Sequence, residues 1–240
     1  MVLILESTYY EKSFRDLLDV YRNRLSDACL ERIQRFKYEN DKGLFLLGRV
    51  LLIEGLKMLK SDHIKLCSLN FNSYNKPYLN GLNFNISHSK NKVVCAISKK
   101  FEVGIDIESI KRMDCYPVEC CFTKSEIDYI NSSKNACIDF YKLWCRKEAA
   151  IKADGRGLNI DPRSFEVINS NINIDQKLWS CFDLKLDPSY ACCLCLNRNG
   201  DWKKNYKVHL LALSPVSLSM NNLFAHCHIV KFRNENNKYP

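Results

Sequence analysis

Residues 102–109, EVGIDIES, carry the pattern that most limits how this chain can fold. Branched apolar residues alternate with smaller or acidic ones: Val103, Ile105 and Ile107 against Gly104, Asp106 and Glu108. Side chains alternate between the two faces of a strand, so the apolar residues share one face and the acids share the other. Like charges on one face repel unless a cation lies between them or water screens them. The pattern predicts a strand whose acidic face holds something, with room for it left by Gly104.

The chain has 240 residues, of which 46% are hydrophobic, enough for a core in one large or two small domains. No stretch approaches the roughly 18 consecutive apolar residues of a membrane span. The opening residues 1–7, MVLILES, lack the basic lead-in of a secretory signal and are typical of a first strand. We therefore expect neither a leader nor a membrane partner.

Thirteen cysteines lie mostly in apolar segments such as 92–98 and 189–197, where the thiol behaves as a small hydrophobic group. This usage indicates a reducing cytoplasm rather than a disulfide framework. Cys192 and Cys195 form a C-x-x-C motif, but no second ligand pair follows at zinc-site spacing. In a strand the two would point to opposite faces. We expect the cysteines to be packing residues.

The formal net charge is +9, from 36 Lys and Arg against 27 Asp and Glu. This excess favours acidic partners, namely nucleic acid, phosphorylated small molecules or an acidic protein, although it can also serve solubility alone. No nucleic-acid-binding motif is recognisable, and such a function would leave the acidic strand unexplained. We expect no nucleic-acid partner.

Hydrophobic periodicity and turn residues predict helices and short strands in two similar series. Helices are expected over 13–36 with a break near Ser26, over 41–60 with Leu47, Val50, Leu51 and Gly55 inward, and over 123–133 and 136–154, ending at Gly155. Strands are expected at 1–7, 63–71, 76–79, 83–87, 92–98, 102–109, 164–168, 180–186, 190–196, 206–213 and 224–232. Each half therefore predicts a long helix packed on antiparallel strands, that is, an α+β protein with two similar subdomains.

Two further segments add candidate site residues. Trp144, Glu148 and Lys152 are spaced i, i+4, i+8 and so share one face of the predicted helix, where an ordinary exposed Glu–Lys pair is the simpler interpretation. His88 stands where a strand enters a turn, and a lone histidine of this kind is most often structural. Each segment alone is weak, so any argument depends on their combination.

Asp106, Glu108 and Glu148 together would offer hard oxygen ligands without thiolate or imidazole, which is a ligand set for magnesium, with manganese as an alternative. Lys152 and His88 could neutralise phosphates beside the metal. The chemistry would then be metal-assisted transfer at phosphorus. Residues 153–158, ADGRGL, lack the spacing of a P-loop, which argues against a kinase of that class. Another magnesium-dependent phosphate-ester enzyme and a non-catalytic basic binding protein remain as alternatives.

Three motifs, FNISHS (84–89), VGIDIE (103–108) and WCRKEAAIKADGRGL (144–158), occur in an order and at separations that resemble the 4'-phosphopantetheinyl transferases of the large, surfactin-synthetase-activating type. The family pattern is G-[IV]-D-[IVL]-E followed by W-x-x-K-E-[AS]-x-x-K, and the two together are highly specific. The resemblance covers residues 35–158 and weakens beyond them. It implies transfer of 4'-phosphopantetheine from coenzyme A to a serine of an acyl or peptidyl carrier protein, with release of 3',5'-ADP.

The resemblance also implies a monomer of two halves related by a pseudo-twofold, with the site at their junction. Residues 1–101 would form the side that holds the adenine and 3'-phosphate of coenzyme A, and 102–240 the side with the metal ligands. Asp106, Glu108 and Glu148 would bind magnesium together with the diphosphate. Lys152 would contact the diphosphate, and Glu148 would act as base for the carrier serine.

Other roles follow from the same resemblance. Ser87 and His88, assisted by Lys76, would hold the 3'-phosphate; Arg32 lies where the family has a basic residue, and Glu126 matches a family acid near the metal. The chain departs from the family at two places. Leu44 and Phe45 stand where a basic residue is usual, so that role passes to Lys42 or Arg49. Asn75 replaces a glycine before Lys76, which is tolerable because Asn accepts left-handed backbone geometry.

The segment 109–126 is where the family docks its carrier. Lys111 and Arg112 suit an acidic partner, and Met113, Tyr116 and Phe122 could supply apolar contacts. The residues leave open whether fatty-acid, polyketide or peptide synthesis is served.

Overall fold

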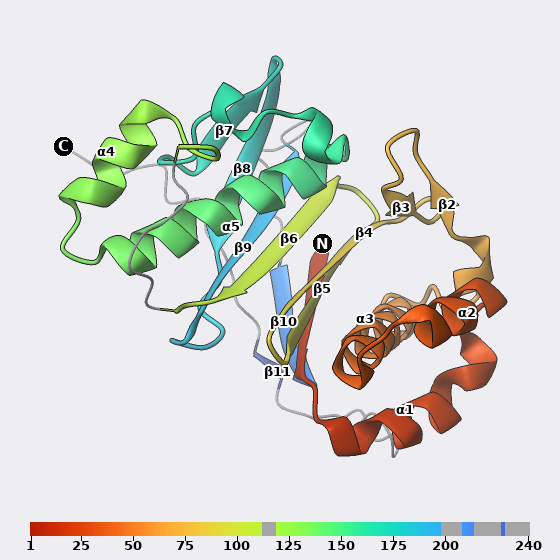
Figure 1. Cartoon of the computed structure of the whole chain (residues 1–240). Coiled ribbons are helices and arrows are strands. Elements are labelled where there is room, and N and C mark those ends of the chain that lie inside the picture. Colours follow the sequence, from red (N-terminus) through yellow and green to blue (C-terminus); the bar gives the residue numbers. More distant parts are fainter. Residues whose placement is uncertain (112–118, 198–207, 214–226, 229–240) are drawn as a thin grey trace.

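A computed structural model describes residues 1–111 and 119–197 and the backbone of two further strands, 208–213 and 227–228. The described residues form an α+β fold in which helices cover two mainly antiparallel sheets (Figure 1). The α-helices are α1 (Phe14–Tyr21), α2 (Asp27–Arg35), α3 (Glu39–Met58), α4 (Lys124–Ser132) and α5 (Ala136–Asp154). None of the described helices combines the length and apolar character needed to cross a bilayer.

The first sheet has the strand order β11-β10-β1-β5-β4. Its strands are β1 (Val2–Thr8), β4 (Asn83–Ser89), β5 (Lys92–Ser98), β10 (Val208–Leu213) and β11 (Cys227–His228). β10 pairs parallel to β1, whereas the other neighbours are antiparallel, so the purely antiparallel prediction is wrong for this pair. The late strands β10 and β11 thus lie in the sheet that residues 1–101 otherwise build.

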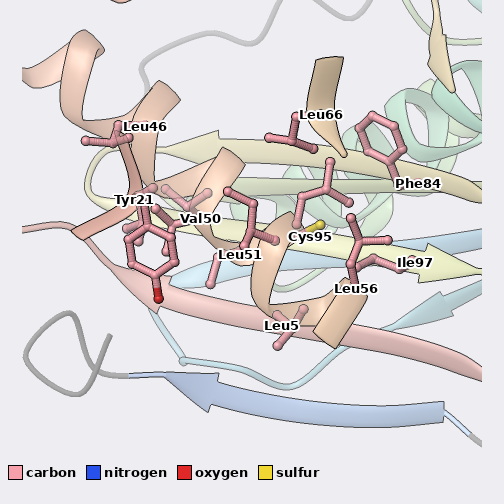
Figure 2. Close-up of a cluster of buried hydrophobic side chains, with 14 of the residues drawn as sticks. Leu5, Tyr21, Leu46, Val50, Leu51, Leu56, Leu66, Phe84, Cys95 and Ile97 are labelled. Atoms are coloured by element: carbon pink, nitrogen blue, oxygen red, sulfur yellow. The ribbon is translucent and has the colours of Figure 1, made fainter. Parts of the chain in front are cut away.

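Helices α1, α2 and α3 cover one face of this sheet (Figure 1). Figure 2 shows Val50 and Leu51 of α3 among the side chains of Leu5 and Cys95 from the strands. A Cβ on Gly55 would lie 2.2 Å from Ile97 Cδ1, so this glycine allows the close approach of α3 to β5. The inward residues predicted for this helix are confirmed.

The second sheet is antiparallel, with the order β6-β9-β8-β7. Its strands are β6 (Val103–Ser109), β7 (Asn171–Ile174), β8 (Lys177–Asp183) and β9 (Tyr190–Asn197), and α4 and α5 pack on one face (Figure 1). The predicted end of α5 is confirmed, because Gly155 caps it with φ of 90°. A short hairpin, β2 (Asn70–Phe71) and β3 (Pro77–Tyr78), completes the described strands.

The strand predicted at 164–168 is wrong. Side chains of α5 bind this segment instead: Lys147 donates to the Phe165 carbonyl, and Arg146 donates to the carbonyls of Val167 and Ile168. The strand forms later, as β7, and joins β8 through Asp175 and Gln176 with φ of 47° and 68°. Two successive positive φ values are typical of a type I′ hairpin turn, which the Asp-Gln pair does not signal as Asn-Gly would.

The two sheets pack on each other through the faces that carry no helices. Val103, Ile105 and Ile107 are fully buried in this shared cluster, which confirms the apolar face predicted for their strand. Cys192 lies in the same cluster and Cys195 under α5, so they point to opposite faces as expected. Each sheet thus has its long helix outside and its partner sheet inside. The pseudo-twofold itself stays a prediction.

Candidate active site

The site forms where β4, an edge of the first sheet, lies beside β6, an edge of the second. Side chains join the two strands: Asn85 Oδ1 accepts from the Ile105 N–H at 2.9 Å, and Ser89 Oγ accepts from the Ser109 N–H at 3.0 Å. The constant offset between bonded positions means that the strands run parallel. Some backbone N–H groups at the free edge of β6 thereby bond to side chains of β4 rather than to the backbone of a neighbouring strand.

The same register brings hydroxyl groups to the two acids. Ser87 Oγ donates to Asp106 Oδ1 at 2.8 Å, and Ser89 Oγ donates to Glu108 Oε2 at 2.9 Å. Lys152 Nζ lies 2.5 Å from Asp106 Oδ1 and 3.1 Å from Ser87 Oγ. The acidic face of β6 therefore does hold a cation here, and that cation is the ammonium of Lys152.

Gly104 sets the position of α5 against this face. A Cβ at Gly104 would lie 2.1 Å from the Ala149 carbonyl oxygen and 2.3 Å from the Ala153 nitrogen, both backbone atoms. The room left by the glycine is thus filled by the helix, which corrects the expectation that it keeps the acid face open. Because Glu148 and Lys152 precede those two alanines, the close contact fixes both of them beside β6.

The carboxyl groups are crowded and short of positive charge. Asp106 is 2% exposed, and its Oδ2 has no hydrogen-bond partner among the described residues. Burial and then the charge of Asp106 raise the pKa of Glu108. Burial also raises the pKa of Glu148, an effect that Lys152 opposes and Asp106 reinforces. A second cation would relieve this crowding.

The chemistry of these donors fits magnesium, because they supply hard oxygen atoms and one buried oxygen lacks a partner. They are not gathered as a finished site, however: the described part of the chain contains no cluster of three or more acidic, His or Cys side chains placed to hold a metal. Burial lowers the pKa of Lys152, whereas the neighbouring carboxylate of Asp106 raises it, and the net shift is upward. The ammonium of Lys152 thus lies against Asp106 Oδ1, one of the oxygen atoms expected to bind the metal.

A pocket of about 290 Å³ opens beside Glu148 and Lys152. It is also lined by Tyr74, Asn75, Lys76, Pro77, Asn85, Ile151, Gly155, Gly157 and Leu158. Leu158 is 96% exposed, so part of this lining is an apolar surface open to solvent. The structure thus brings three predicted site residues, Lys76, Glu148 and Lys152, to one concave surface at the junction of the halves.

Lys76 is oriented by the end of α5. Its Nζ donates to the Ala153 carbonyl at 2.7 Å, and burial lowers its pKa to about 8. Asn75 has φ of 63°, which confirms the left-handed geometry expected for this position. His88 is exposed at the end of β4, where partial desolvation and then Lys152 lower its pKa.

Arg32 lies in a different concavity, on α2. This second concavity, of about 480 Å³, is lined by Ala28, Glu31, Arg32, Arg35 and Phe36. The guanidinium groups of Arg32 and Arg49 lie 5.1 and 4.7 Å from the centroid of the Phe45 ring. Leu44 is buried in the core, and Lys42 pairs with Glu39. Phe45 therefore serves as a platform between two arginines, an arrangement that the sequence did not predict.

Glu126, which the resemblance places near a metal, is held in a buried ion pair. It is fully buried, its Oε2 lies 2.8 Å from Lys147 Nζ, and its Oε1 accepts from the Val167 N–H at 2.7 Å. It also closes a capping box with Thr123 at the start of α4. With both oxygens engaged, Glu126 and Lys147 act as a structural tie, and a fully buried lysine gave no signal in the sequence.

The predicted docking segment is described only in part. Phe122 is 2% exposed and packs on Phe140 and Trp144, with ring centroids 5.6 and 6.3 Å apart, so it is not presented to a partner. Lys111 is exposed, and its carbonyl accepts from the Cys137 thiol at 3.4 Å. The other predicted contacts, Arg112, Met113 and Tyr116, lie outside the described residues.

The fold is α+β, and its acid–lysine group lies where β4 of the first sheet meets β6 of the second. Comparison with known proteins gives the family. A model of the 4'-phosphopantetheinyl transferase superfamily matches residues 102–202. The 4'-phosphopantetheinyl transferase gsp of Aneurinibacillus migulanus is 37% identical over 71% of this chain and 76% of its own length.

Two further relatives agree. The 4'-phosphopantetheinyl transferase Sfp of Bacillus subtilis is 31% identical over 71% of this chain and 81% of its own length. The mouse L-aminoadipate-semialdehyde dehydrogenase-phosphopantetheinyl transferase is 33% identical over 81% of this chain and 76% of its own length. The chain therefore belongs to the 4'-phosphopantetheinyl transferase superfamily and is a transferase of that kind.

Proposed function

We propose that this transferase moves 4'-phosphopantetheine from coenzyme A to a serine hydroxyl of an acyl or peptidyl carrier protein and releases 3',5'-ADP. The observation that carries the proposal is the crowded acid face of β6, which is held against Lys152 beside an open pocket. Acids that bind a cation next to a pocket suit a diphosphate substrate, whose negative charges need neutralising as the bond to phosphorus breaks.

Asp106, Glu108 and Glu148 would hold Mg²⁺, or Mn²⁺, which when bound would neutralise the diphosphate. The hydroxyl groups of Ser87 and Ser89 support this by orienting Asp106 and Glu108. Lys152 would turn from Asp106 to the diphosphate, because Lys152 lines the pocket while its ammonium lies against Asp106. Its flexible stem suits such a change of partner.

Glu148 is the group that we assign to the proton of the carrier serine. Burial raises the pKa of Glu148, which makes it a stronger base than an ordinary carboxylate. The serine oxygen forms the new bond to the β-phosphorus of coenzyme A, the bond from that phosphorus to 3',5'-ADP breaks, and the serine proton passes to Glu148.

The other half would hold the nucleotide end. Lys76 already lies in the pocket, and His88 and Ser87 lie at the end of β4. Arg32 would reach a phosphate from α2, from its platform on Phe45. An acidic carrier would approach near Lys111, consistent with the net charge of +9. We propose that the enzyme is a monomer, because one chain supplies both walls of the site. A cytoplasmic location fits its many cysteines.

The test is incubation with coenzyme A, Mg²⁺ and an apo carrier protein, followed by intact mass spectrometry of the carrier. We expect a gain of one phosphopantetheine, its loss in excess chelator, and a fall in rate of at least about a hundredfold for Asp106→Ala. Asp19→Ala, which removes an exposed carboxylate from α1, is the matched control and should keep the full rate. Coenzyme A hydrolysis without carrier modification would instead indicate another phosphate-ester enzyme.

A further inference from the structure

Two cysteines adjacent in the sequence, Cys120 and Cys121, place their sulfur atoms 3.2 Å apart just before α4. Cys120 is exposed and Cys121 is half-buried, whereas most described cysteines are buried packing residues. No disulfide joins the pair. The expectation that the cysteines only fill the core therefore does not account for these two.

The pair lies on one side of the proposed base. Phe122, which follows Cys121, packs on Trp144, and Trp144 stands one helical turn before Glu148 on α5. Glu148 is also among the charges that act on the Cys121 thiol, after burial and Cys120. The pocket beside Glu148 and Lys152, which we assign to coenzyme A, extends instead from Glu148 toward the C-terminal end of α5. The two thiols therefore lie on the other side of Glu148, next to the segment assigned to the carrier.

The geometry selects one ligand chemistry. A disulfide needs sulfur atoms about 2.05 Å apart, much closer than these. Zinc prefers four ligands, and no cluster of three or more acidic, His or Cys side chains exists in the described residues to provide them. A trivalent arsenic atom needs only two sulfur ligands besides its own substituent, with bonds near right angles. A separation of 3.2 Å suits such bidentate binding.

We propose that Cys120 and Cys121 form a dithiol site for trivalent arsenicals, and that the bound group blocks the carrier protein but not coenzyme A. The effect on the carrier rests on the proposed function, whereas the binding of the arsenical does not. With phenylarsine oxide, two As–S bonds form and the As–O double bond is lost. The oxygen leaves as water with the two thiol protons, and arsenic stays trivalent.

Binding is tested with phenylarsine oxide on the native full-length protein, by intact mass and by a count of titratable thiols. We expect one adduct, two fewer thiols, and reversal by ethanedithiol but not by a monothiol. Cys120→Ser and Cys121→Ser should each weaken binding about a hundredfold or more, because the second sulfur acts at high effective concentration. The control Cys67→Ser, at an exposed site on the other half, should bind like the unchanged protein. Equal binding by Cys120→Ser or Cys121→Ser would refute the site.

The consequence for the carrier is tested on the adduct. Carrier modification should slow about tenfold or more, whereas the Kd for coenzyme A, from calorimetry, should change less than about twofold. Transfer at the normal rate, or an equal loss of coenzyme A binding, would contradict the assigned position of the pair. Failure of the untreated protein to modify any carrier would count against the proposed function, while the mass measurement would still decide the dithiol site.

Discussion

Replacing Gly104 with alanine tests how the site is positioned. The added Cβ would lie 2.1 Å from the Ala149 carbonyl oxygen, where an ordinary carbon–oxygen contact is about 3.3–3.6 Å. The neighbouring atoms belong to the backbone of α5, so no side chain can rotate away. The helix must therefore move by about 1 Å or more, and it carries Glu148 and Lys152 with it.

A misplacement of about 1 Å typically costs a reaction about a hundredfold, so single-turnover transfer by Gly104→Ala should fall by that factor. Overpacking should lower the free energy of unfolding by about 1–3 kcal/mol, which leaves a folded protein. Both quantities can be measured on one preparation, by carrier mass shift and by urea unfolding.

Gly81→Ala provides the matched control. Gly81 has φ of +73° and no atom within 4 Å of an added Cβ, so alanine there costs about 1–2 kcal/mol of backbone strain without moving any element. We expect a similar loss of stability with unchanged transfer. If Gly104→Ala transferred as fast as Gly81→Ala, the claim that this glycine positions α5 for the reaction would be refuted.

Three further outcomes are expected. Because the pKa of Glu148 is raised, kcat/KM should fall as the pH drops through a value above the usual glutamate range, and Glu148→Gln should abolish this limb and cost about 10²-fold or more in single-turnover rate. Lys152→Ala should weaken coenzyme A binding by about 1–3 kcal/mol in calorimetry, and unchanged affinity would exclude a phosphate contact. Glu126→Ala should lower the free energy of unfolding by about 3–5 kcal/mol, because it leaves the buried charge of Lys147 without its counter-charge, and the double variant with Lys147→Met should recover much of this loss.

Local patterns predicted much of the fold. The alternation in 102–109 predicted the strand and its buried face, Ser26 marked a break in the helical segment, and Gly155 marked the end of another helix. These features depend on contacts close in the sequence, or on the single fact that one face is buried. For the same reason the helices and the acidic strand were predicted almost in full.

Features set by distant contacts were not predictable in this way. The segment 164–168 has the composition of a strand, but Arg146 and Lys147 of α5 donate hydrogen bonds to its carbonyl groups. Nothing nearby in the sequence signals these contacts. Glu126 matched a family acid, yet it forms an ion pair with Lys147, a fully buried lysine on α5. Gly104 was expected to leave room for what the acids hold, but the sequence could not show that the backbone of α5 fills this room.

The parallel strand β10 has a consequence for how the chain is made. It pairs with β1 from Val2 to Ser7, although nearly the whole chain separates the two partners. On the ribosome, the first half emerges early and can begin to fold, since domains tend to fold in order of synthesis. Until residue 208 has left the exit tunnel, however, one edge of β1 has no partner and is exposed to pairing with other chains. A nascent chain therefore has to keep this edge protected, and a truncation before β10 should yield a protein prone to aggregate even though the proposed active-site residues are all present.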